Sequence, residues 1–131
     1  MYQKVIIVGN LGQDPEMRFT PAGQAVTNFS VATTRPYTVD GNKIEETVWF
    51  RVSTWGKLAE ICNQYLSKGK QVFVEGRLTV DKETGGPRTW QAKDGTWRAS
   101  YEIMAHEIKF LGQRDNGGSQ SGDVSEDEIP F

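Results

Sequence analysis

The chain has 131 residues, of which 37% are hydrophobic and 24% are charged. This length and balance fit one folded domain and argue against a fibrous repeat or disorder throughout. One Cys excludes an internal disulfide, and the apolar run at residues 5–8 is too short for a signal peptide or a membrane span, so we expect a cytosolic protein.

The formal net charge of −2 is unevenly distributed along the chain. Residues 112–131 hold one Arg and five acidic residues, a net charge of −4, which leaves +2 for residues 1–111. A mildly basic body with an acidic tail is expected of a protein that binds a polyanion. The tail is rich in Gly, Ser, Gln and Asn and cannot bury a core, so we predict a domain over residues 1–111 and a flexible acidic tail over residues 112–131.

The first half of the body predicts three strands and a helix. Residues 5–8 form a short apolar strand, residues 25–34 are rich in β-branched and small side chains, and residues 47–55 alternate between apolar and polar. Residues 57–67 then carry apolar side chains at helical spacing, and Gly69 follows as a stop signal.

Alternation returns over residues 71–80, where the pattern places Val72, Val74, Leu78 and Val80 on one face. A polar, Gly-rich segment over residues 81–96 precedes a final predicted strand over residues 97–111. Three strands, one helix and two strands match an all-β fold, a five-stranded Greek-key barrel with its helix between strands three and four.

Two indoles lie on the polar face of the predicted strand over residues 47–55. The opposite face carries the apolar side chains of Val48, Phe50 and Val52. Trp49, Arg51 and Trp55 therefore point outward, where packing gives no reason for large aromatic rings. Unpaired bases stack on such rings at about 1–3 kcal/mol per base whatever their sequence, and Arg contacts phosphates. An oligomer interface that covers the indoles is the alternative.

Positive charge and further aromatic rings accompany this strand. Tyr37 follows Arg35, and Trp90 follows Arg88, which repeats the basic-plus-aromatic pairing at loop positions, whereas Trp97 opens a predicted strand and is not included in the site. We expect phosphate contacts from the cations on or beside predicted strands: Lys4, Arg18, Arg35, Arg51, Lys57, Lys70 and Arg88.

Residues 4–19 read KVIIVGNLGQDPEMRF, and shorter stretches read VAT at 31–33, WFRV at 49–52, WGKLAE at 55–60, YLSKG at 65–69 and VEG at 74–76. These segments resemble the bacterial single-stranded DNA-binding protein family over residues 3–111. The resemblance implies an OB fold, a homotetramer, and single-stranded DNA wrapped around it during replication, recombination and repair. It also implies base stacking on Tyr37, Trp49, Trp55 and Trp90.

The acidic tail ends in an apolar hook, whose last residues are Asp127, Glu128, Ile129, Pro130 and Phe131. Carboxylates suit a basic rim, and the apolar side chains suit a pocket. The family that the chain resembles uses a near-identical tip to recruit replication, recombination and repair proteins, so we expect a partner-binding tip. A merely solubilising tail would explain the charges but not the terminal Phe.

No catalytic or metal site is expected. His106 is the only His and Cys62 the only Cys, which excludes His-pair and Cys-cluster metal sites and leaves no obvious pair of nucleophile and base. Cys62 falls on the apolar stripe of the predicted helix and is expected in the core. We therefore predict a binding protein without a cofactor and not an enzyme; the alternatives are an OB-fold RNA-binding protein or chaperone, and an adaptor that acts through its tail.

Overall fold

A computed structural model describes residues 1–111. The tail and the predicted partner-binding tip, at residues 112–131, lie outside the described residues. In chain order the elements are β1 (Val5–Leu11), β2 (Glu16–Phe19), β3 (Ala25–Val39), β4 (Asn42–Trp55), α1 (Gly56–Tyr65), β5 (Gln71–Leu78), β6 (Thr89–Gln91), β7 (Trp97–Ala99) and β8 (Tyr101–Phe110).

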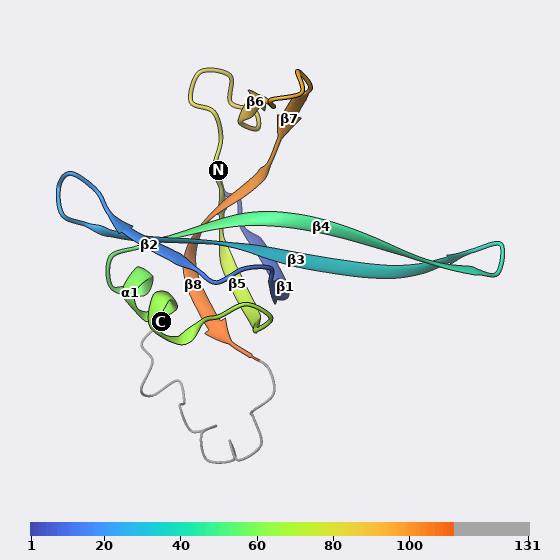
Figure 1. Cartoon of the computed structure of the whole chain (residues 1–131), viewed down its shortest axis with the longest axis horizontal. Coiled ribbons are helices and arrows are strands. Elements are labelled where there is room, and N and C mark those ends of the chain that lie inside the picture. Colours follow the sequence, from blue (N-terminus) through green and yellow to red (C-terminus); the bar gives the residue numbers. More distant parts are fainter. Residues whose placement is uncertain (112–131) are drawn as a thin grey trace, which may run out of the picture.

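Five of these strands close a barrel. Their order is β1-β5-β8-β4-β3, and a further pairing of β1 with β3 closes the ring. The β4–β8 pairing is parallel, whereas the others are antiparallel. The helix α1 lies between β4 and β5, the third and fourth barrel strands (Figure 1). This is the five-stranded Greek-key arrangement, so the predicted fold class is confirmed.

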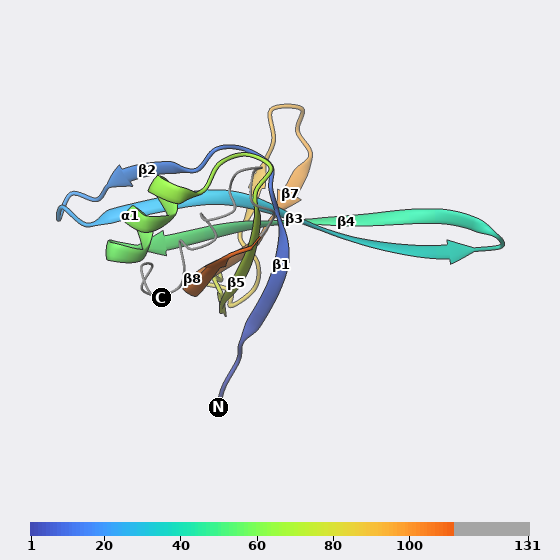
Figure 2. The same cartoon turned by 90° about the horizontal axis from the view of Figure 1, so that it is seen from below.

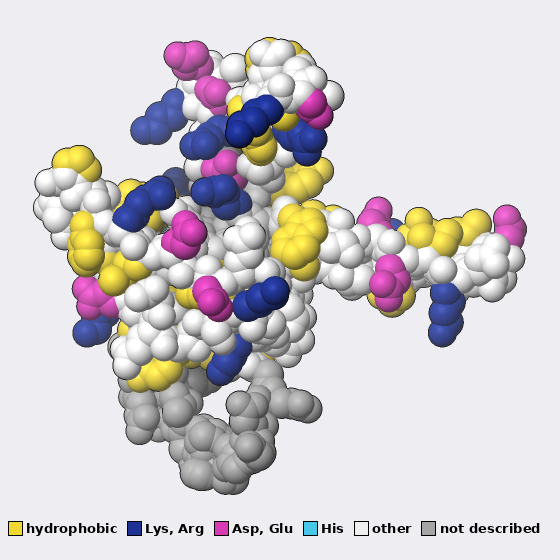
Figure 3. Space-filling model, viewed as in Figure 1, with side chains coloured by type: hydrophobic (Ala, Val, Ile, Leu, Met, Phe, Trp, Pro, Cys, Tyr) yellow, Lys and Arg dark blue, Asp and Glu magenta, His cyan; other side chains and the backbone are white. Residues whose placement is uncertain are grey.

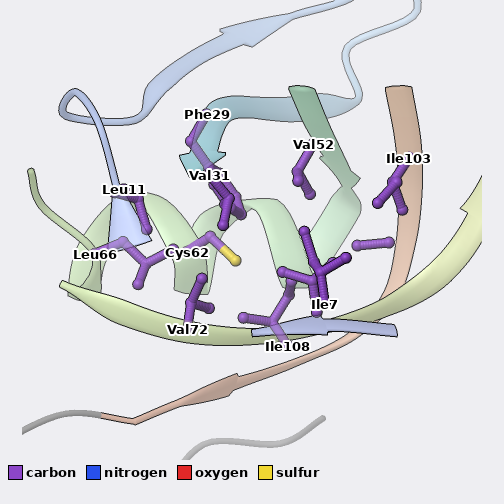
Figure 4. Close-up of a cluster of buried hydrophobic side chains, with 12 residues drawn as sticks. Ile7, Leu11, Phe29, Val31, Val52, Cys62, Leu66, Val72, Ile103 and Ile108 are labelled. Carbon is purple, nitrogen blue, oxygen red and sulfur yellow. The ribbon is translucent and has the colours of Figure 1, made fainter. Parts of the chain in front are cut away.

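The barrel interior is filled with apolar side chains from every barrel strand and from α1 (Figure 4). The buried cluster comprises Ile7, Leu11, Phe29, Val31, Val52, Cys62, Leu66, Val72, Val74, Ile103, Ala105 and Ile108. Burial raises the pKa of the Cys62 thiol to about 12. The thiol therefore stays protonated at neutral pH, and the expected core position of Cys62 is confirmed.

One buried hydroxyl group fixes α1 to the barrel, and a second joins β4 to β3 beside it. The Thr27 hydroxyl donates to the carbonyl oxygen of Ala59 in α1 at 2.7 Å, and the Thr54 hydroxyl donates to the carbonyl oxygen of Thr27 at 3.0 Å. Both side chains are fully buried, so their hydrogen bonds offset the cost of removing them from water. The helix therefore starts at a fixed position directly after Trp55.

The strands β3 and β4 continue well beyond the barrel as a two-stranded arm (Figures 1 and 2). Val39 pairs with Asn42, and the two residues between them, Asp40 and Gly41, have φ values of 51° and 79°. Positive φ at both positions is typical of a type I′ hairpin turn. The strands predicted over residues 25–34 and 47–55 were therefore too short. Residues 35–46 are exposed on both faces and show no apolar alternation, so the sequence pattern did not indicate strands there.

The segment predicted as a polar excursion holds a second hairpin. The strands β6 and β7 pair only with each other in the described part of the chain. The final strand predicted over residues 97–111 is confirmed as the barrel strand β8 at residues 101–110, but its predicted start was too early, since Ser100 separates β7 from β8. The short strand β2, which pairs with β3, was not predicted.

The predicted inward face of residues 71–80 is buried only in its first half. Val72 and Val74 are fully buried, but Leu78 and Val80 are exposed. The register shift at Glu75 and Gly76 leaves an extra residue in β8 and not in β5, and Leu78 lies opposite the fully buried Ile103, so Leu78 keeps its predicted face. Leu78 and Val80 line a small apolar hollow at the end of the barrel.

Candidate nucleic-acid interface

The outer side of β4 carries both predicted indoles. Val52 is fully buried, whereas the side chains of Trp49 and Trp55 are 53% and 38% exposed. Arg51 lies between them and is exposed. The alternation predicted for this strand is therefore confirmed. A rise of about 3.3 Å per residue separates the two indoles by roughly 20 Å along the strand.

Neighbouring strands extend this surface. In the β3–β4 register Val26 lies opposite Trp55, Asn28 opposite Ser53, Ser30 opposite Arg51 and Ala32 opposite Trp49, and in the β2–β3 register Arg18 lies opposite Val26. Paired residues in antiparallel strands share a face. We call this surface the indole face, and its members are Arg18, Asn28, Ser30, Ala32, Trp49, Arg51, Ser53 and Trp55; Val26 lies on the same side of β3 but is buried.

The floor between the indoles is polar and small. The Ser53 hydroxyl donates to the amide oxygen of Asn28 at 2.8 Å, and a shallow hollow beside Arg51 is lined in part by Asn28 and Ser30. Because the side chains between them are small, the rings of Trp49 and Trp55 extend further from the sheet than their neighbours. The sequence prediction missed Asn28 and Ser30, although alternation of small or polar residues with Thr27, Phe29 and Val31 was a signal for them.

Gly12 lies against the ring of Trp49. A Cβ atom at this glycine would be 2.5 Å from Cζ3 and 2.7 Å from Cη2 of Trp49. The Gly12 amide donates to the carbonyl oxygen of Ser30 at 3.1 Å, which holds the β1–β2 connection beside the indole face. The structure adds a role in positioning Trp49.

We expect Gly12→Ala to weaken binding to oligothymidine while leaving the barrel intact. The new Cβ must displace the Trp49 ring, which can rotate, so stability changes by less than about 1 kcal/mol and affinity falls by about 3- to 10-fold. Fluorescence titration measures the affinity and chemical denaturation the stability. In a Trp49→Ala background the same change has no further effect on affinity; a further loss there would show that Gly12 acts by another route.

Four predicted phosphate ligands lie on or near the indole face. Arg18 and Arg51 belong to it, and Lys57 lies in the first turn of α1, two residues after Trp55. The carbonyl oxygen of Lys70 accepts a hydrogen bond from the Leu11 amide at 2.9 Å, which places the Lys70 backbone beside the Gly12 connection. Arg18, Arg51, Lys57 and Lys70 are exposed and make no ion pair within residues 1–111.

Arg88 lies near this region because it forms an ion pair with Glu102. Its Nε atom lies 3.5 Å from Oε2 of Glu102, and Glu102 lies opposite Arg51 in the β4–β8 register. In the space-filling view, Lys and Arg side chains gather around the base of the β6–β7 hairpin and the adjoining part of the barrel (Figure 3). On this face of the molecule, positive charge is thus present between the hairpin and the barrel.

The remaining predicted site residues are placed elsewhere. Lys4 pairs with Glu75 on the β1–β5 side of the barrel, and its hydrogen bond to Glu75 raises the pKa of its ammonium group. Tyr37 lies on the arm, and the guanidinium carbon of Arg35 lies 4.9 Å from the centroid of its ring. Arg35 also forms an ion pair with Glu46 at 2.9 Å. By alternation along β3, Tyr37 lies on the opposite face of the strand from Ala32, the neighbour of Trp49.

Trp90 lies on β6, and its side chain is 45% exposed. Of the four predicted stacking residues, the structure therefore brings only Trp49 and Trp55 onto one sheet face. Tyr37 and Trp90 belong to the two hairpins that project from the barrel (Figure 1).

The described residues were also compared with the requirements of a metal site and of a membrane span. Within residues 1–111 there is no group of three or more His, Cys, Asp or Glu side chains that could hold a metal ion. The described part of the chain also has no helix with the length and apolar character needed to span a membrane. On the indole face, exposed rings and cations that make no ion pair within residues 1–111 occur together.

Comparison with known proteins identifies relatives along nearly the whole described chain. The chain is 44% identical over 120 residues to Single-stranded DNA-binding protein 1 of Chlorobaculum tepidum, which is 90% of this chain and 70% of the relative. It is 46% identical over 117 residues to the Single-stranded DNA-binding protein of Neisseria meningitidis serogroup A (88% and 63%) and 49% identical over 115 residues to that of Xanthomonas axonopodis pv. citri (87% and 60%).

The chain thus spans between 60% and 70% of the length of these relatives. The model of the Single-strand binding protein family matches residues 2–111, which include every strand and the helix of the structure. This match also agrees with the prediction of a binding protein that is not an enzyme. The chain belongs to the Single-strand binding protein family.

Proposed function

We propose that this chain binds single-stranded DNA without regard to sequence and protects it during replication, recombination and repair. The observation that carries the proposal is the indole face, where Trp49 and Trp55 stand exposed on either side of Arg51. The names of the relatives, which are called single-stranded DNA-binding proteins, support the choice of ligand.

The arrangement accounts for binding without sequence preference. Every base has a π-face, so a ring such as Trp49 or Trp55 accepts any base, while cations contact the repeating phosphates. Arg18, Arg51 and Lys57 are exposed and have no acidic partner within residues 1–111, so their charge is available for this contact. Tyr37 and Trp90 extend the stacking surface onto the two projecting hairpins in this proposal.

The proposal includes assembly as a homotetramer. The outer side of β1 exposes Ile6 and Val8, and Val8 lies opposite Phe73 in the β1–β5 register. Adjacent apolar side chains on an outer sheet surface are typical of a protein interface. A symmetric pairing of this surface with a second copy would cover it, leave the indole face open and give a dimer, and two such dimers make up the proposed tetramer.

Affinity for oligothymidine should fall steeply as salt rises, because bound cations on the DNA are released when phosphates are neutralised. The expected slope of log affinity against log salt is about −0.7 for each phosphate contacted on a single strand, so three contacts from Arg18, Arg51 and Lys57 give a slope near −2. Titrations at several salt concentrations, followed by Trp fluorescence and by mass, measure it. A salt-independent affinity would contradict the proposed phosphate contacts.

A competition experiment distinguishes DNA from RNA as the preferred ligand. DNA and RNA strands of equal length compete for the protein, and we expect the protein to retain the DNA. Preferential retention of RNA would favour the alternative of an OB-fold RNA-binding protein or chaperone, since RNA differs at the site by its 2′-hydroxyl groups.

We further propose that the tip of the chain recruits replication, recombination and repair proteins; the tip comprises Asp127, Glu128, Ile129, Pro130 and Phe131. This function places the protein in the cytoplasm, in association with the nucleoid. Deletion of residues 126–131 should leave DNA binding unchanged or slightly tighter, because an anionic segment can compete with phosphates for the cations. Oligothymidine titration of the full chain and the deletion variant measures this. Loss of DNA binding on deletion would contradict the division between body and tip.

A further inference from the structure

Glu16 is an acidic residue on the side of the sheet that is proposed to bind DNA. It lies opposite Asn28 in the β2–β3 register, so its side chain shares the side of the sheet that carries the indole face. The carboxylate is exposed and makes no hydrogen bond or ion pair within residues 1–111. Like charges repel, so this group weakens phosphate binding. Contact with phosphates therefore gives no reason for an acid at this position.

The nearby Asp14 differs from Glu16 because it has a structural partner. Its carboxylate accepts a hydrogen bond from the Lys68 amide at 2.8 Å, which holds the β1–β2 connection beside the segment that follows α1. Asp14, Glu16 and Arg51 line the same shallow hollow. Neither acid forms an ion pair with Arg51 in the described part of the chain. The Glu16 carboxylate and the Arg51 guanidinium group therefore both remain available to a ligand.

Asn28 places a hydrogen-bond donor beside the Glu16 acceptor. Its amide oxygen accepts from the Ser53 hydroxyl at 2.8 Å, which fixes the orientation of the amide and directs its NH₂ group away from Ser53. This NH₂ group makes no hydrogen bond within residues 1–111. Directly paired residues of antiparallel strands have Cβ atoms about 4.5–5.5 Å apart. An acceptor and a donor thus lie next to each other at the hollow.

The hollow is large enough for the ring of a base. Its volume is about 150 Å³. An enclosed cavity of about that volume holds benzene, a ring of the same size as a pyrimidine. Asn28 and Arg51, which line the hollow, lie between Trp49 and Trp55 on the sheet. A base of a strand that passes from one indole to the other can therefore turn its edge into the hollow.

The acceptor and the donor distinguish two classes of base. Cytosine and adenine carry an amino group beside a ring nitrogen that accepts, whereas thymine and guanine carry a carbonyl oxygen beside a ring N–H group. Glu16 can accept from an amino group while Asn28 donates to the adjacent ring nitrogen. A base of the second class in the same pose sets acceptor against acceptor and donor against donor, so neither hydrogen bond forms.

We propose that Glu16 and Asn28 form a base-reading subsite, at which the protein favours cytosine or adenine over thymine or guanine. The inference rests on the proposed function, to which it adds a preference at one position of the bound strand. Stacking and phosphate contacts remain common to every sequence, so the preference is small beside the total affinity. Selectivity among bases thus accounts for an acid that weakens phosphate binding.

The test compares oligodeoxycytidine with oligodeoxyuridine of equal length. Uracil differs from cytosine in its carbonyl oxygen and its ring N–H group, which are the two groups that the subsite reads. Titrations are followed by Trp fluorescence at mildly alkaline pH, at which cytosine strands do not self-associate. We expect Glu16→Gln to raise affinity for the uracil strand, because a repulsive charge is lost. The ratio of cytosine to uracil affinity should fall by about fivefold, because an amide can turn to pair with either base.

Two further variants separate base reading from charge. Glu60→Gln removes the same charge from an exposed position of α1, and it should leave the ratio unchanged. Asn28→Asp keeps an acceptor for the Ser53 hydroxyl but replaces the donor by an acceptor, so the ratio should fall by a similar factor to that in Glu16→Gln. Circular dichroism checks that each variant is folded.

Two results would overturn the inference while the proposed function survives. An unchanged ratio in Glu16→Gln would show that Glu16 acts only as a repulsive charge. An equal fall of the ratio in Glu60→Gln would show that the ratio follows net charge and not the hollow. Failure of the parent protein to bind either strand would instead remove the proposed function, and the subsite with it.

Discussion

Replacing both indoles of the indole face, Trp49→Ala with Trp55→Ala, should lower affinity for oligothymidine by at least about 25-fold, since each lost base stack removes about 1–3 kcal/mol. The barrel should keep its stability, because both rings lie outside the core. Anisotropy of a labelled oligonucleotide measures affinity without depending on the indoles that are removed.

The matched control is Trp49→Phe with Trp55→Phe. A smaller flat ring still stacks on a base, so this variant should retain affinity to within a few-fold. Unchanged affinity in the Ala variant would refute stacking at these positions. Equal losses in the Ala and Phe variants would instead indicate that the indoles act through their shape or their N–H groups.

Gly9→Ala should strongly destabilise the barrel at the point where β1 crosses β3. A Cβ atom there would lie 2.2 Å from the carbonyl oxygen of Ala32 and 2.8 Å from Cγ1 of Val31. The first of these is a backbone atom, so no side-chain rotation relieves the clash. We expect a loss of about 3 kcal/mol or more, toward the upper end for overpacked positions, and a fall in Tm of at least about 12 °C.

Gly86→Ala is the control for this change. Its nearest contact would be Oγ1 of Thr84 at 3.7 Å, an ordinary van der Waals distance. Its stability should therefore remain within about 1 kcal/mol of the parent. Both variants are compared at equal protein concentration, because self-association would stabilise the folded state. Similar stabilities for the two variants would show that the β1–β3 crossing relaxes more readily than its geometry indicates.

The sequence predicted those parts of the fold in which one face of an element is buried. In β4, Val52 is buried and its neighbours Arg51 and Ser53 point outward, so a period of two was visible and placed Trp49 and Trp55 on the outer face. The apolar stripe of α1 predicted the helix and the core position of Cys62 in the same way.

The parts that escaped prediction have no buried face. Residues 35–46 of the arm are exposed on both sides, so only the turn chemistry of Asp40 and Gly41 indicated a hairpin. Asp94 and Gly95 gave the same signal in the segment read as irregular. The support of Trp49 by Gly12 depends on a contact between β4 and a distant connection, which no local pattern contains.

The division of β4 into two faces limits how the gene can change. Insertion or deletion of a single codon between Trp49 and Trp55 would put the two indoles on opposite faces of the strand, since neighbouring positions alternate between the faces. The loop over residues 81–88 carries no such constraint, because it contains no strand. Changes in chain length can therefore alter how far the β6–β7 hairpin projects from the barrel. The spacing between Trp49 and Trp55 in β4 stays fixed, because this strand carries core side chains on one face and the indoles on the other.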